Sequence, residues 1–291
     1  MTFKPGLLLA CAFGAPLVAH GQAGAVEQLR AAHLSLQVQL SNNQFNRPVA
    51  LVSNETKDTL KGDIYAVISY RLEAVTAGLN NPARWCDVLL LHINTKSCRA
   101  QAGPGSTILR VHLGGKKPEA LNDATRVNFD YRALASTPDY LAIGLDAKDG
   151  PMGTSNFRIR FEALALPDGN SFIHLGYSYQ MNFAARLAMS GYLSTVGRGK
   201  SGFTVLGQQA DGQSQYIGGL RGLVERNTMR YFLAINAYLE SATAAPGTQL
   251  ERRLQNWFAA VEKYPRQLHE MDRQEYLSMK RAEHQRQLST P

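Results

Sequence analysis

The sequence predicts an α+β fold in which a largely antiparallel sheet is followed by one long amphipathic helix. Residues 61–72 alternate apolar and polar side chains as a strand does. Two further alternating runs, residues 157–163 and 172–179, flank a tight-turn sequence. Residues 219–244 carry apolar side chains at helical spacing. The 291 residues are 44% hydrophobic, so the chain can fill a sizeable core.

Residues 1–21 have the three-part pattern of a cleaved export signal. Lys4 is followed by an apolar run from Gly6 to Val18 and by the small-x-small triplet Ala19-His20-Gly21. This run is far shorter than the roughly 20 residues that a membrane-spanning helix needs. We therefore expect a periplasmic or secreted protein. In an alternative interpretation, Leu8-Leu9-Ala10-Cys11 is a lipidation box and Cys11 becomes a lipid-bearing N-terminus.

Two cysteines, Cys86 and Cys98, remain once the signal has taken Cys11 away. An even pair in an exported protein favours a disulfide, because such bonds persist in oxidising compartments. The bridge would close a loop of about a dozen residues and stabilise the fold by about 2–3 kcal/mol. The alternative is a pair of buried thiols that happen to lie near each other.

The chain is basic, with a formal net charge of +8 that includes Lys4. For an exported protein, this charge favours an anionic membrane surface as partner, and we expect no nucleic acid. The alternative is a basic surface that only aids solubility.

The N-terminal extension, residues 22–60, leaves one choice open. Residues 26–40 fit a helix, but residues 34–40 also alternate as a strand does. A polar cluster at residues 41–43 ends this segment, and residues 48–53 begin an extended one.

From residue 61 the predicted order is strand, helix, helix. The strand at 61–72 is rich in β-branched and aromatic residues. A short helix at 73–79 follows, and a second at 83–91 begins after Pro82, a residue that the first helical turn tolerates.

Residues beyond 106 are mostly strands, at 107–113, 126–134 and 140–145. The clearest hairpin joins 157–163 to 172–179 through Pro167-Asp168-Gly169-Asn170, in which proline presets φ and glycine accepts a positive φ. Such a succession of strands favours an antiparallel sheet.

The last third of the chain is mainly helical. Residues 182–193 fit either a helix or a further strand, and 202–206 fit a strand. The strongest helix, 219–244, ends at Ala244-Ala245-Pro246-Gly247. The tail, 249–287, reads as two amphipathic helices divided near Tyr264-Pro265.

No catalytic motif stands out. The histidines are scattered and none has zinc-helix spacing, and the chain has no nucleophile elbow, phosphate loop or dinucleotide fingerprint. Gly197 to Gly202 is glycine-rich and basic, but it lacks the spacing of a phosphate loop and is interpreted as a basic turn. We assign no catalytic residue, no metal and no cofactor.

The densest polar group lies on the long helix. One-turn spacing of Arg221 with Glu225, and of Arg226 with Arg230, fits a local ion-pair ladder. Asn227 instead falls on the apolar stripe, where a buried polar side chain needs a partner. That partner could be the sheet backbone or a ligand head group.

This order of elements resembles the START-like (SRPBCC) helix-grip superfamily. The residues that carry the resemblance are 62–68 as first strand, 82–87 in the helix pair and 218–241 as gripping helix. It implies a curved antiparallel sheet wrapped on the long helix over residues 61–245, with residues 246–291 as an added helical tail. The tail and the segment 182–195 depart from the usual pattern.

The resemblance implies a cavity for a lipid or another hydrophobic molecule between sheet and helix, and no catalytic residue is carried over from it. We therefore expect an exported carrier or binding protein rather than an enzyme. An enzyme of cyclase or hydrolase type would draw its acid or base groups from Glu225, Asn227 or His174. A third hypothesis is an envelope structural or adaptor protein that acts through its C-terminal helices. The candidate ligand-binding residues are Phe161, Tyr177, Tyr179, Phe203, Asn227, Tyr231 and Ile235, for which the alternative role is a packed core.

Overall fold

The computed structural model describes residues 17–103, 105–195 and 197–289. Within them, eight strands form one sheet in the order β1-β2-β8-β7-β6-β5-β4-β3, each antiparallel to its neighbours. This sheet and the long helix beside it confirm the predicted α+β class. The strands are β1 (Val49–Glu55), β2 (Thr59–Ile68), β3 (Thr95–Ala102), β4 (Thr107–Leu113), β5 (Thr125–Ser136), β6 (Tyr140–Asp149), β7 (Thr154–Ala165) and β8 (Ser171–Met181).

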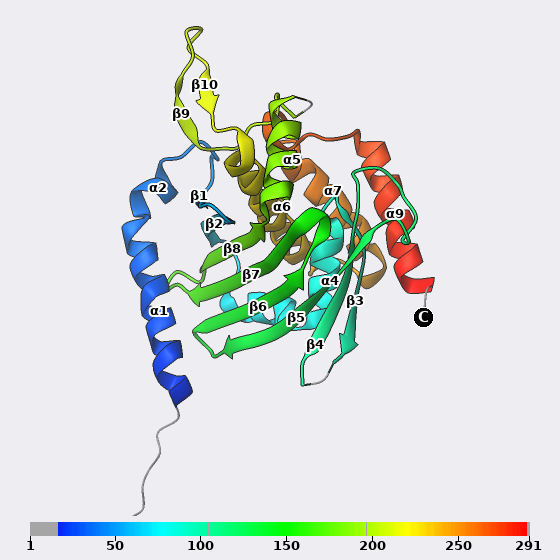
Figure 1. Cartoon of the computed structure of the whole chain (residues 1–291). Coiled ribbons are helices and arrows are strands. Elements are labelled where there is room, and N and C mark those ends of the chain that lie inside the picture. Colours follow the sequence, from blue (N-terminus) through cyan, green and yellow to red (C-terminus); the bar gives the residue numbers. More distant parts are fainter. Residues whose placement is uncertain (1–16, 104, 196, 290–291) are drawn as a thin grey trace, which may run out of the picture.

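The strand order gives the fold its shape. Strand β2 pairs with β1 and β8 near one edge of the sheet, whereas the next strand in sequence, β3, forms the opposite edge. The chain crosses between them through α3 (Leu72–Leu79) and α4 (Pro82–Leu91). The sheet bends, and α6 (Gly219–Ser241) lies within the bend against β1, β2 and β8 (Figure 1). The chain has a helix-grip fold.

Alternation along the strands builds the main core between the sheet and α6. Phe157, Ile159 and Phe161 of β7 are buried on the inner face, as their spacing predicts. The predicted turn after β7 is also present. Gly169 has a φ of 83°, and the Asp168 carboxylate accepts the N–H of Asn170 at 3.0 Å.

A smaller core lies on the outer face of the sheet. Leu29 of α1 (Leu17–Ser35) and Leu40 of α2 (Gln37–Ser41) are buried with Tyr140 and Phe172. Of the two structures considered for residues 26–40, the helix is therefore correct. Residues 1–16 of the expected export signal lie outside the described residues.

The predicted elements differ from the structure in two places, and the structure decides a third that the sequence left open. No strand was predicted at β3, whose residues 95–97 are polar in type but buried. The segment left open at 182–193 is a helix, α5 (Phe183–Ser194), which the Asn182 side chain caps by accepting the N–H of Ala185. The strand predicted at 202–206 begins later, as β9 (Val205–Gln208), which pairs with β10 (Ser214–Tyr216) in a separate hairpin.

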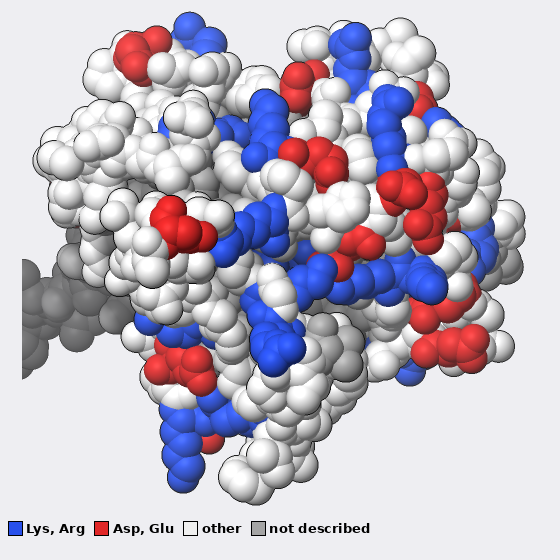
Figure 2. Space-filling model, turned by 90° about the horizontal axis from the view of Figure 1, so that it is seen from above, with Lys and Arg blue, Asp and Glu red and all other residues white. Residues whose placement is uncertain are grey.

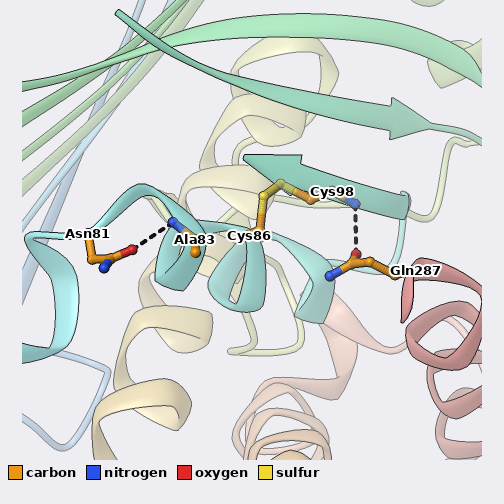
Figure 3. The surroundings of a disulfide bond; sticks show 5 residues. All are labelled: Asn81, Ala83, Cys86, Cys98 and Gln287. Atoms are coloured by element: carbon orange, nitrogen blue, oxygen red, sulfur yellow. Dashed lines mark hydrogen bonds between the residues drawn. A yellow bond between two sulfur atoms is a disulfide. The ribbon is translucent and has the colours of Figure 1, made fainter. Parts of the chain in front are cut away.

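The predicted disulfide between Cys86 and Cys98 is confirmed, with a Cα–Cα distance of 5.0 Å (Figure 3). It joins α4 to β3. Helix α9 (Arg273–Ser289) also binds this strand, because the Gln287 side chain accepts the N–H of Cys98 at 2.8 Å (Figure 3). Both contacts fix the edge of the sheet that the chain reaches after its long crossing.

The C-terminal tail shares the main core. It contains α7 (Gln249–Val261), α8 (Pro265–Leu268) and α9, and Trp257 stacks on Tyr276 with ring centroids 4.8 Å apart. Glu283 of α9 forms ion pairs with two fully buried lysines, Lys96 at 3.2 Å and Lys280 at 2.8 Å. Among the described residues, no helix is both long enough and apolar enough to cross a bilayer. The shorter elements are two 3₁₀ helices, η1 (Pro151–Gly153) and η2 (Pro246–Thr248).

Candidate functional site

A cavity of about 500 Å³ lies between α6 and the inner face of the sheet. Its walls come from the end of β8, the start of β7, η1, α5 and the first half of α6. The tail and the segment before α6 contribute Glu270 and Lys200. The long helix therefore covers a hollow at one end of the sheet, and the other end is filled.

One wall of the cavity is aromatic. Tyr177 and Tyr179 alternate on β8 and so face the same side, where Phe157 stacks on Tyr179 at 5.1 Å. Tyr231 of α6 contacts Tyr177 at 5.2 Å. Burial raises the pKa of all three phenols. In the described part of the chain, no group forms a hydrogen bond with their hydroxyls.

The opposite wall carries a carboxylate surrounded by cations. Glu270 accepts Lys116 and Lys200 on Oε2, at 2.6 and 2.7 Å, and Arg230 on Oε1 at 2.8 Å. Burial alone would raise the pKa of Glu270, but the charge of Arg230 and the bonds from both lysines lower it to about 2. Glu270 is therefore ionised, and its charge is shared among three partners.

Arg226 also lines the cavity but has a different environment. It is only 3% exposed, and its Nη1 donates to the carbonyl of Ser201 at 3.1 Å. Burial, and next the charge of Arg230, lower the pKa of Arg226 to about 10. Within the described residues, no carboxylate lies within 4.0 Å of its guanidinium.

His92 is buried beside these groups and stacks on Tyr231 at 4.7 Å. Its Nδ1 accepts the backbone N–H of Asn94 at 3.2 Å, so the neutral ring carries its proton on Nε2. Burial, then the charges of Arg230 and Lys280, hold the pKa of His92 well below its ordinary value. Nε2 has no hydrogen-bond partner among the described residues.

Charged side chains mark this end of the molecule from outside as well. Figure 2 shows the face seen from above Figure 1, where Lys and Arg gather across the middle with Asp and Glu between them. In the described segments, no group of three His, Cys, Asp or Glu side chains is arranged to hold a metal ion.

Four of the seven candidate ligand-binding residues line the cavity. They are Tyr177, Tyr179, Asn227 and Tyr231, and the Asn227 side chain accepts Arg230 at 3.3 Å.

The other three candidates lie elsewhere. Phe161 and Ile235 belong to the filled core, at 0% and 1% exposure. Phe203 packs against Phe45 and Tyr264 beside a separate surface pocket.

The ion-pair ladder considered for α6 is absent from the described residues, because its members bind other elements. Glu225 is fully buried and accepts four hydrogen bonds, from the Ser53 hydroxyl, the backbone N–H of Phe203, and the backbone N–H and hydroxyl of Thr204. Arg221 donates to Ser53, and Arg230 pairs with Glu270. Glu225 therefore anchors the segment before the β9–β10 hairpin to α6.

His174, a second candidate acid or base, lies on the outer face of the sheet. Its Nε2 contacts Asp63 and its Nδ1 contacts Glu162, both at 2.8 Å, and its ring stacks on Tyr65. Burial alone would lower the pKa of His174, but the bonds to the two carboxylates raise it. Of the three residues considered for catalysis, only Asn227 borders the cavity.

Sequence reasoning missed Lys116, Lys200, Glu270 and His92 as site residues. They come from four separate segments of the chain, so no spacing in the sequence links them. The one usable signal was on α6, where Arg226 and Arg230 lie on either side of Asn227 and share its cavity.

The sequence matches no protein-family model and no curated protein. Similar solved structures include the Zhui aromatase/cyclase from Streptomyces sp. R1128, at 11% identity and a TM-score of 0.34, covering 71% of this chain and 96% of that one. Norcoclaurine synthase from Thalictrum flavum has 9% identity and a TM-score of 0.31, covering 67% and 88%. Ara h 8.0201 has 12% identity and a TM-score of 0.36, covering 66% and 99%. The fold is assigned from the order of this chain's own elements, because structural similarity at these TM-scores and identities is too low to support an assignment.

Proposed function

We propose that this protein binds a hydrophobic small molecule between α6 and the sheet, as a carrier or binding protein of START-like type. The observation that carries the proposal is the cavity of about 500 Å³ with its aromatic wall. Small-molecule sites are typically apolar hollows of roughly 300–1,000 Å³ with a few polar groups that orient the ligand. A lipid-like molecule suits the mixture of Phe157, the methionines of β8 and α5, and the tyrosines.

We propose binding rather than catalysis because the acidic and basic candidates are committed to other contacts. The Glu225 carboxylate is saturated by four hydrogen bonds, and His174 lies on the outer face between two carboxylates. The attraction of the basic surface to anionic membranes stays a prediction.

Titration with a neutral fluorescent probe, N-phenyl-1-naphthylamine, tests the proposal. We expect saturable binding with enhanced emission, because an apolar ring system leaves water for the cavity. Leu223→Trp should weaken binding about tenfold or more, since the larger ring occupies volume in the cavity wall. Leu206→Trp, on the exposed β9 strand, is the matched control and should bind like the wild type. Absence of saturable binding by the wild-type protein would contradict the proposal.

We further propose that the protein acts outside the cytoplasm. The pattern of residues 1–21 supports export, and the disulfide between Cys86 and Cys98 supports an oxidising compartment.

Intact mass spectrometry of the protein from cell fractions tests export. We expect a periplasmic or secreted chain that begins at Gln22 and lacks free thiols. A lipid-modified chain beginning at Cys11 would favour the alternative signal. A full-length cytoplasmic chain with reduced cysteines would contradict both.

A further inference from the structure

The wall of the cavity that β8 and α6 form has unused donor capacity. The hydroxyls of Tyr177, Tyr179 and Tyr231 can each donate, and none has a hydrogen-bond partner among the described residues. Arg226 uses one guanidinium nitrogen on a backbone carbonyl and leaves its remaining N–H groups without a carboxylate. A ligand that satisfied this wall would be rich in acceptors.

The charge balance of the cavity points the same way. Among the described residues, four cationic side chains line it, and Glu270 forms ion pairs with Lys116, Lys200 and Arg230 but not with Arg226. The cavity's two further carboxylates, Glu119 and Asp123, form no ion pair with these cations. Glu270 and Glu225 attract the Arg226 guanidinium only from beyond 4.0 Å. Burial of a guanidinium without a close counter-ion is costly, and a bound anion would offset that cost.

The apolar and cationic walls are close enough for one molecule to touch both. Arg226, Tyr179 and Phe157 line the same cavity, and Tyr179 stacks on Phe157 at 5.1 Å. A planar guanidinium fork matches the oxygens of a carboxylate or phosphate in a bidentate arrangement.

We propose that the ligand is an amphipathic organic acid, whose apolar body lies along Phe157, Tyr177 and Tyr179 and whose carboxylate or phosphate binds Arg226. This inference rests on the proposed function, because it names the class of molecule that the same cavity takes. In this arrangement Glu270 holds Arg230 and the two lysines, and Arg226 is the cation left for the ligand.

Displacement of N-phenyl-1-naphthylamine by matched twelve-carbon ligands tests the inference. Dodecanoate, dodecyl phosphate and dodecan-1-ol share a chain of roughly one length and differ in head group. We expect at least one of the acids to displace the probe about tenfold more effectively than the alcohol, equivalent to about 1.4 kcal/mol. The stronger acid identifies carboxylate or phosphate as the preferred group.

Arg226→Gln should abolish the preference for the acids over the alcohol. The amide of Gln is polar but carries no charge. Arg252→Gln, an identical charge change at an exposed position of α7, is the matched control and should keep the preference. Arg226→Lys keeps the charge and loses the fork, so an intermediate preference is expected.

The outcomes separate the two proposals. If the wild-type protein binds the probe and both acids compete no better than the alcohol, the organic-acid inference is wrong and the hydrophobic-ligand proposal stands. If the wild-type protein does not bind the probe, the proposed function itself is wrong. The wild-type comparison needs no variant, so it decides the question even if Arg226→Gln fails to fold.

Discussion

At the scale of single residues, His174 shows how a sheet can hold a charged imidazole. Its two nitrogens contact Asp63 and Glu162, while Tyr140 donates to Glu162 and Lys61 pairs with Asp63. Burial disfavours each charged group, but the mutual hydrogen bonds raise the pKa of His174 and lower those of both carboxyls. The cluster is therefore most stable when the imidazole is protonated and the carboxyls are not.

This cluster makes stability depend on pH. The raised folded pKa of His174 gives stability that is complete below its unfolded pKa of about 6.5 and is lost as pH rises through the folded value. The lowered pKa values of Asp63 and Glu162 give stability that is lost as pH falls below about 4.

Denaturant unfolding of wild type and His174→Gln, at several values between about pH 5 and pH 8, tests this. The wild-type free energy of unfolding should fall toward pH 8, with about 1.4 kcal/mol for each tenfold difference in proton affinity. His174→Gln cannot carry the charge, so its profile should be flatter across the same range. Parallel profiles for wild type and His174→Gln would contradict this account.

At the scale of elements, β3 and α9 depend on each other. Lys96 of β3 and Lys280 of α9 are both fully buried and share the carboxylate of Glu283. Lys280 also donates to the carbonyls of His92 and Thr95, and burial, offset by Glu283, lowers its pKa to about 8.

Glu283→Gln should therefore destabilise the protein by about 3–5 kcal/mol, because it leaves two buried cations without their shared anion. Chemical denaturation measures the change. Glu275→Gln, on the exposed side of the same helix, should cost less than about 1 kcal/mol. Equal stabilities for the two variants would show that the buried cluster does not hold α9.

Most elements could be predicted from local pattern, and the failures have physical reasons. Strands β2, β7 and β8 alternate apolar and polar residues, and α6 has apolar residues at helical spacing. Both patterns arise because one face of the element is buried, so they can be recognised in the sequence. β3 was missed because Thr95, Lys96 and Ser97 are buried polar residues. The partner that makes burial of Lys96 possible, Glu283, comes much later in the chain.

At the scale of the whole molecule, the helix-grip arrangement was predictable and the position of its hollow was not. Tyr177, Tyr179 and Tyr231 line the cavity, whereas Phe161 and Ile235, equally apolar and on the same faces, fill the core. The spacing of apolar residues predicts on which face of an element a side chain lies. It does not predict at which end of the space between α6 and the sheet a cavity remains. The cationic wall assembles from separate segments, so only the folded chain brings Lys116, Lys200 and Glu270 together.

The attachment of α9 also changes what the sheet offers to other chains. As the terminal strand, β3 would expose a row of backbone groups able to recruit a strand from a neighbour, a common start of aggregation. Here the Gln287 side chain accepts the N–H of Cys98, and the backbone carbonyl of Gln287 accepts a hydrogen bond from the Arg99 side chain. The disulfide links the same strand to α4. Helix α9 thus covers an edge strand that would otherwise be open to pairing with a strand of a neighbouring chain.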